Sequence, residues 1–107
     1  MNIRIFWLVL IFTFSINSIW SQNNVTLNGV ISDIESSETL IGVNILFPEL
    51  KTGATTNEYG FYSITLPEGT YKIVISYLGY SEVSETITLS ENLTKNFALA
   101  ESVESLN

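Results

Sequence analysis

Apolar and polar residues alternate with a period of two along most of this chain. In residues 62–66 the tyrosine, isoleucine and leucine side chains fall on one face of a strand. Residues 71–77 repeat the pattern with β-branched and aromatic residues, and the Pro-Glu-Gly-Thr of residues 67–70 supplies turn chemistry between the two runs. We therefore predict a hairpin with one apolar face and with Gly69 at positive φ. The rest of the chain must cover that face, because an isolated hairpin is marginal in water.

The same period predicts further strands before and after the hairpin, in residues 25–33, 43–47, 53–56, 81–89 and 93–99. Pro48 should end the second of these strands or lie at its edge, because proline cannot donate to a sheet ladder. Gly29 weakens the first strand unless a bulge or a close approach of another backbone segment needs a glycine there. Seven short strands at roughly ten-residue spacing predict an all-β sandwich or barrel. An apolar face on every strand favours two sheets packed face to face.

The first 21 residues break this pattern. Arg4 precedes the almost wholly apolar run of residues 5–14, and a more polar stretch leads to Ser21. A positive start, a short apolar core and a small residue before a polar segment are the three parts of a secretory signal peptide. An apolar run of about ten residues is short against the roughly 20 that a membrane-spanning helix needs. We expect a signal peptide over residues 1–21, a domain over 22–99, and a tail over 100–107 that is frayed or a linker.

The composition excludes several classes of function. The 107 residues fit one small domain, and the net charge of −7, from 11 acidic and 4 basic residues, argues against a nucleic-acid partner. The chain contains no histidine and no cysteine, which removes the usual metal ligands, the usual general base and any thiol nucleophile. We therefore expect no catalytic residue, no cofactor and no metal site, and a fold that depends on its hydrophobic core.

Two acidic or polar loops could still be interpreted as cation sites. Asp33, Glu35 and Glu38 lie close together, but a calcium loop needs several oxygens at fixed spacing around a turn glycine, and that arrangement is absent from their sequence. A solvated acidic loop is the favoured interpretation. Residues 57–60, Asn-Glu-Tyr-Gly, are explained by a β-turn that uses asparagine and glycine.

Four aromatic residues could form a surface on which a carbohydrate stacks. They are Tyr59, Phe61, Tyr77 and Tyr80. Core packing and sheet edges are the favoured interpretation of these side chains. Paired carboxylates for acid–base chemistry would need a pocket, and a mature domain of about 86 residues has little room for one.

Five short motifs follow one another in order through nearly the whole chain after the leader. They are residues 29–33 (GVISD), 40–45 (LIGVNI), Gly53 with 55–62 (TTNEYGFY), 66–71 (LPEGTY) and 76–80 (SYLGY). In this order they resemble the carboxypeptidase regulatory-like domain at the N-terminus of many TonB-dependent outer-membrane receptors of the Bacteroidetes. The resemblance implies a seven-stranded Greek-key β-sandwich of the transthyretin or prealbumin kind, without catalytic residues. It also implies that glycines 29, 42, 60, 69 and 79 shape corners.

The resemblance also implies a function. In such receptors the domain lies on the periplasmic side, ahead of the energy-coupling segment, the plug and the barrel. Residues 101–107 resemble the lead-in to that coupling segment, so we expect a fragment of a longer nutrient-uptake receptor, exported to the periplasmic face of the outer membrane. It would be non-enzymatic, with the rest of the receptor and the energy-coupling complex as its protein partners. It would meet the membrane only through a barrel that this sequence does not contain.

The alternative is a free-standing exported module. Such a module would bind a glycan or a protein through exposed aromatic side chains and a free sheet edge. The two hypotheses differ in the reading frame that they expect downstream of the domain in the gene. In neither does the sequence name a transported substrate, because that specificity would lie in the plug and the barrel.

Overall fold

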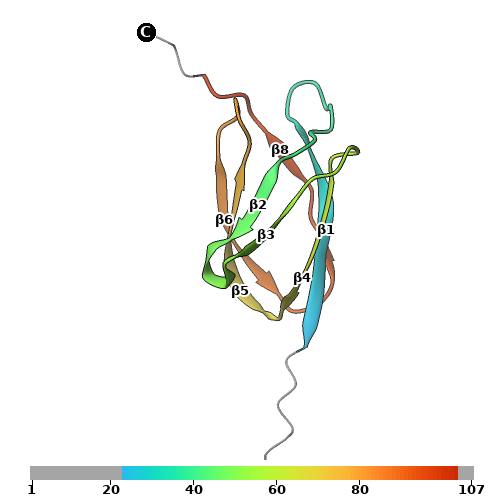
Figure 1. The fold of residues 1–107 in the computed structure, drawn as a ribbon, viewed down its shortest axis with the longest axis vertical. Coiled ribbons are helices and arrows are strands. Elements are labelled where there is room, and N and C mark those ends of the chain that lie inside the picture. The colour runs from blue at the N-terminus through green and yellow to red at the C-terminus, as the bar shows by residue number, and fades with distance from the viewer. Residues whose placement is uncertain (1–22, 104–107) are drawn as a thin grey trace, which may run out of the picture.

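The computed structural model describes residues 23–103, which form two β-sheets packed face to face (Figure 1). In the first sheet, β1 (Asn24–Asp33) pairs antiparallel with β4 (Phe61–Pro67) and parallel with β7 (Leu93–Thr94) and β8 (Phe97–Leu99). The second sheet has the order β3 (Thr52–Thr55), β2 (Asn44–Phe47), β5 (Gly69–Ser76) and β6 (Val83–Leu89). A short 3-10 helix, η1 (Pro48–Leu50), connects β2 to β3. The predicted all-β sandwich is confirmed.

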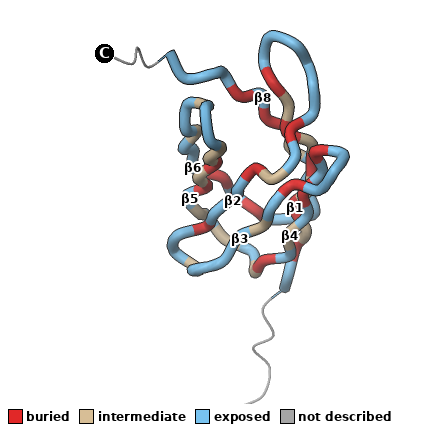
Figure 2. The backbone as a smooth tube through the Cα atoms, turned by 45° about the horizontal axis from the view of Figure 1, so that its top comes forward, coloured by how far each residue is buried: buried red, intermediate tan, exposed pale blue. Residues whose placement is uncertain are grey.

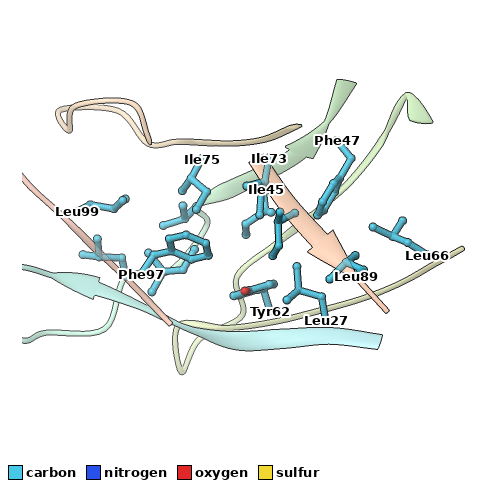
Figure 3. Packing of buried hydrophobic residues seen from close by; sticks show 14 of the residues in the cluster. Leu27, Ile45, Phe47, Tyr62, Leu66, Ile73, Ile75, Leu89, Phe97 and Leu99 are labelled. Atoms are coloured by element: carbon cyan, nitrogen blue, oxygen red, sulfur yellow. The ribbon is translucent and has the colours of Figure 1, made fainter. Parts of the chain in front are cut away.

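The core lies between the two sheets and is filled by the in-phase side chains of nearly every strand (Figure 3). Along β1 buried and less buried residues alternate, as the period of two predicts (Figure 2). Leu27 of β1, Ile45 of β2 and Ile73 of β5 are fully buried. Burying one such side chain stabilises the fold by about 1.5–3 kcal/mol. Tyr62 joins this core from β4, and burial raises the pKa of its hydroxyl to about 12.

The predicted hairpin of residues 62–66 and 71–77 is wrong. β4 pairs along its length with β1, whereas β5 pairs with β2 and β6, so the two strands lie in different sheets. Residues 67–69 carry the chain from one sheet to the other, and the N–H of Glu68 donates to the carbonyl of Asn23 at 2.9 Å. A period of two identifies the inward face of a strand but carries no information about its partner. The two apolar faces do meet, across the core.

The glycines expected at corners divide into two groups. Gly42, Gly60 and Gly79 have φ values of 82°, 75° and 88°, in the left-handed region that suits glycine. Gly69 has no positive φ and begins β5, so the predicted positive φ at this position is wrong. Gly29 lies within β1, where its missing side chain leaves room for another segment of backbone.

The backbone segment that lies against Gly29, at Lys95, divides the last predicted strand in two. Residues 93–99 form β7 and β8 instead of one strand, because the chain crosses over Gly29 between them. The N–H of Lys95 donates to the carbonyl of Asn28 at 2.7 Å, and the N–H of Val30 donates to Asn96 Oδ1 at 2.8 Å. Of the two explanations considered for Gly29, a bulge or a close backbone approach, the structure shows the close approach, and the eighth strand is its consequence.

Of the two remaining boundary predictions, one is confirmed and the other falls on residues that the structure does not describe. β2 ends at Phe47 and Pro48 begins η1, as predicted. The predicted signal peptide, residues 1–21, lies outside the described residues. Between residues 23 and 103, no helix has the length and apolar character needed to cross a membrane.

Candidate functional site

One end of the sandwich gathers most of the longer connections of the chain. There β1, β3, β5 and β8 end and β2, β4 and β6 begin. The reason is that β1 pairs antiparallel with β4, β2 with β3 and β5, and β5 with β6, whereas β8 is parallel to β1. The described chain also leaves from this end, which is uppermost in Figure 1. We call it the exit end. Its connections are residues 34–43, 56–60, 77–82 and 100–103.

Asp33 organises the first of these connections. It is the last residue of β1 and is buried, with 7% of its surface exposed. Its Oδ1 accepts hydrogen bonds from the N–H groups of Glu35 at 2.8 Å and Ser36 at 3.0 Å, and its Oδ2 accepts one from the Tyr80 hydroxyl at 2.7 Å. These bonds, led by that from the Ser36 N–H, hold the pKa of the Asp33 carboxyl below its usual value.

The prediction that Asp33, Glu35 and Glu38 lie in a solvated acidic loop is therefore wrong for Asp33. Asp33 is a buried structural carboxylate, whereas Glu35 and Glu38 are exposed. Among residues 23–103, no three histidine, cysteine, aspartate or glutamate side chains come together as a metal site would need. The sequence could not reveal the role of Asp33, because its partner Tyr80 is 47 residues away.

Tyr80, in the turn after β5, contacts both Asp33 at the end of β1 and Glu101 after β8. Its hydrogen bond to Asp33 is the first cause that raises the pKa of the Tyr80 hydroxyl to about 12, with burial and nearby negative charges adding to it. Its ring lies 5.5 Å from that of Tyr77, centre to centre, at a tilt of 38°. Tyr80 also forms an isolated β-bridge with Glu101.

The beginning of the predicted tail is thus not frayed. The Ser81 N–H donates to the Ala100 carbonyl at 2.9 Å, and the Ser102 N–H donates to the Gly79 carbonyl at the same distance. These two bonds hold residues 100–102 against the turn between β5 and β6. Residues 100–102 are therefore held to the sandwich by its own backbone groups.

Two neighbouring residues stabilise the connection between β3 and β4. Thr56 is buried, and its hydroxyl accepts a hydrogen bond from the Val43 N–H at 2.9 Å and donates one to the Leu40 carbonyl at 2.6 Å. Asn57 Oδ1 accepts hydrogen bonds from the N–H groups of Tyr59 and Phe61, at 2.9 and 3.1 Å. The predicted turn at residues 57–60 is confirmed. Thr56 had been predicted only as the end of a short strand.

An open hollow of about 850 Å³ lies beside the turn between β5 and β6. We call it the exit hollow; its wall includes Gly42, Asn44, Tyr77, Leu78, Tyr80 and Val103. The side chains of Leu78 and Val103 are 97% and 95% exposed. The hollow offers apolar and hydroxyl groups to a binding partner, and the chain contains no histidine or cysteine that could act there as a base or nucleophile. Its chemistry suits binding.

The four candidate aromatic residues do not share one environment. Tyr77 and Tyr80 stack on each other and pack against the core, half-buried. Tyr59 is 71% exposed and Phe61 is 41% exposed, and both are positioned by the Asn57 turn. The exposed apolar residues of the exit hollow were missed, because Leu78 and Val103 lie outside every strand pattern. The signal that the sequence offered was a leucine, Leu78, directly before a turn glycine, Gly79.

Comparison with known proteins identifies the family. Residues 27–107 match the model of the CarboxypepD_reg-like domain. The chain belongs to this family. Over 76 residues it is 38% identical to TonB-dependent receptor P39 of Formosa agariphila, a match that covers 70% of this chain and 7% of the receptor. The match therefore spans a small part of that relative.

Solved structures of low sequence identity share the fold. A type II cohesin–X-dockerin complex of Acetivibrio cellulolyticus aligns with a TM-score of 0.60 at 17% identity, covering 68% of this chain and 52% of that chain. A DUF3823 family protein of Bacteroides ovatus gives 0.55 at 18%, covering 74% and 45%. The C-terminal domain of the shaft pilin SpaA of Lactobacillus rhamnosus GG gives 0.57 at 14%, covering 76% and 100%. At these identities the likeness shows the β-sandwich alone.

Proposed function

We propose that this domain is the N-terminal, non-enzymatic module of a TonB-dependent outer-membrane receptor for nutrient uptake. The observation that carries the proposal is the 38% identity to a short part of a TonB-dependent receptor, together with the family match over residues 27–107. In this proposal residues 1–21 are a signal peptide, residues 22–99 the sandwich, and residues 100–107 the link to the rest of the receptor. The module lies on the periplasmic face of the outer membrane.

Its action is protein–protein contact. The exit end supports this, because residues 100–102 are hydrogen-bonded to the β5–β6 turn and give the outgoing chain a defined direction. A module fixed in this way can hold the next segment of a receptor in one orientation toward the energy-coupling complex. The exit hollow beside that link offers a surface for such a partner.

The genomic sequence downstream of this domain provides the test of this proposal. Reading the genomic sequence downstream of the codon for Asn107 should show a frame that continues into a coupling segment, a plug and a barrel. A stop codon in a complete gene, with no plug-encoding frame after it, would overturn the receptor proposal.

A free-standing exported binding module is the second proposal, because the second sheet ends in two edge strands and the aromatic residues Tyr59 and Phe61 are exposed. β6 and β3 are the outer strands of the second sheet. Such edges can accept a further strand from a partner. A glycan array and a pull-down with the exported protein would test this proposal, and absence of binding to any ligand would count against it.

A further inference from the structure

Exposed apolar side chains concentrate at the exit end. Eight large hydrophobic residues are exposed within residues 23–103, and five of them lie in the exit-end connections. Those five are Ile34, Ile41, Tyr59, Leu78 and Val103. Single exposed apolar residues are ordinary on a protein surface, but a concentration of them marks an interaction site. Figure 2 shows these connections as mostly exposed, outside the buried strands.

The same connections carry only negative charge. Exposed glutamates stand in all four of them, at positions 35, 38, 58, 82 and 101. No lysine or arginine occurs in residues 34–43, 56–60, 77–82 or 100–103. Lys51 lies in the connection between β2 and β3, Lys72 within β5, and Lys95 between β7 and β8, where it pairs with Glu85 at 3.8 Å. The exit-end connections therefore have a negative potential that no lysine or arginine within them offsets.

We propose that the exit hollow is a docking site for a basic and apolar polypeptide segment of another protein. This inference rests on the proposed function only in that the domain works by contacting another polypeptide. Leu78 and Val103 provide apolar contact at the hollow. Glu82 also lines the hollow, and the exposed Glu101 lies two residues before Val103, so both can attract positive charge. Complementary charge steers such a partner and fixes its orientation.

Charge also decides against the other occupants of an exposed apolar end. The anionic headgroups of a membrane surface would be repelled by the five exposed glutamates. A second copy of the chain would bring two surfaces of the same negative sign together. A small molecule is held by burying about 70–90% of its surface, whereas this hollow is open and has the almost fully exposed Leu78 in its wall.

The position of the hollow connects binding to the outgoing chain. Ser102 and Val103 form part of its wall, and Ser102 is hydrogen-bonded to Gly79 in the β5–β6 turn. A segment bound there would contact both the turn and the link. Binding should therefore slow amide hydrogen exchange at Ser81 and Ser102, whose N–H groups close this contact.

Binding can be measured with the full chain and a defined probe. The probe is a synthetic eight-residue peptide of alternating lysine and leucine with blocked ends; its matched control replaces every lysine by glutamate. Titration of ¹⁵N-labelled protein with the lysine peptide should shift the amide signals of residues 77–82 and 100–103. Affinity should fall as salt rises, because the Debye length is already about 10 Å at 0.1 M. The glutamate peptide should cause no shift.

Matched variants separate the site from general attraction. Leu78→Ser should weaken peptide binding about tenfold, as expected for losing the burial of a leucine-sized group. Leu46→Ser removes an exposed leucine from β2, and it should leave the affinity unchanged. Glu82→Gln with Glu101→Gln should weaken binding and its salt dependence, whereas Glu68→Gln, in the link between β4 and β5, should not.

Three results would overturn the proposal. They are lysine-peptide shifts spread evenly over the domain, binding to vesicles of phosphatidylethanolamine and phosphatidylglycerol, and dimerisation of the chain that Leu78→Ser abolishes. None of them bears on the receptor proposal, which depends on the frame downstream of Asn107. Conversely, a stop codon there would leave peptide binding at the exit hollow standing.

Discussion

The carbonyl oxygen of Lys95 occupies the space that a side chain on Gly29 would need. The same oxygen accepts a hydrogen bond from the Tyr62 hydroxyl at 2.6 Å, so the crossing is fixed to β1 on one side and to β4 on the other. One missing Cβ therefore allows β7 and β8 to pair with β1 in two pieces.

Gly29→Ala should destabilise the domain, because its Cβ would meet backbone and not a side chain that can rotate away. Overpacking of this kind costs about 1–3 kcal/mol. Gly69→Ala is the matched control, since its Cβ would meet first the end of the Tyr71 side chain. Urea unfolding should show the larger loss for position 29. An equal or smaller loss there would refute the crossing.

Ile73→Asp should unfold the domain. Ile73 is fully buried in β5, and an unpaired charge there costs several kcal/mol against a total stability of about 5–15 kcal/mol. Thr86→Asp places the same charge on the exposed face of β6, opposite Lys72, and should be tolerated. Circular dichroism would compare the two variants. A cooperative thermal transition near that of the wild type in Ile73→Asp would show that the strand phase is wrong.

Thr56→Val keeps the shape of a buried side chain but removes its hydroxyl. The Val43 N–H and the Leu40 carbonyl would then lose their partner, which costs about 1–3 kcal/mol for a buried polar group. Thr55→Val, on the exposed neighbour, should change the free energy of unfolding little. Equal stabilities of the two variants in urea would argue against the role of Thr56.

Acid should weaken the domain partly through Asp33. Its pKa is lowered in the folded state, so its contribution to stability is complete above the unfolded value of 3.8 and is lost as pH falls through the folded value. Asp33→Asn should therefore show a smaller drop in unfolding free energy between pH 7 and about pH 2 than the wild type. Tyr80→Phe removes one of the bonds that lower this pKa, and its drop should be intermediate. The unfolding midpoint in urea at each pH provides the measurement; identical drops in all three proteins would exclude Asp33 as the cause.

Sequence patterns predicted the strands and their inward faces but not their partners. Tyr62, Leu66, Ile73 and Ile75 are buried as their phase required, because alternation follows directly from strand geometry. Whether β4 joins β1 or β5 depends on contacts between distant segments, which a local pattern does not contain. The turn residues in 67–70 are compatible with a hairpin, but in the structure they lie where the chain passes from one sheet to the other.

The candidate site was predicted less well, for a related reason. The bond between Asp33 and Tyr80 joins the end of β1 to a connection 47 residues away, so a local pattern at Asp33 predicts only a solvated loop. Ala100 and Ser102 form hydrogen bonds through backbone groups, which carry no sequence signature. The family motif at residues 76–80 did locate the turn that forms one wall of the exit hollow.

The receptor proposal is tested most directly by the size and location of the polypeptide that carries this domain in its own cells. An antibody against the domain should detect, in the outer-membrane fraction, a polypeptide far larger than 107 residues. The domain should resist external protease in intact cells and be cleaved once the outer membrane is opened. A band of 107 residues or fewer in the soluble fraction or the medium would contradict the receptor module.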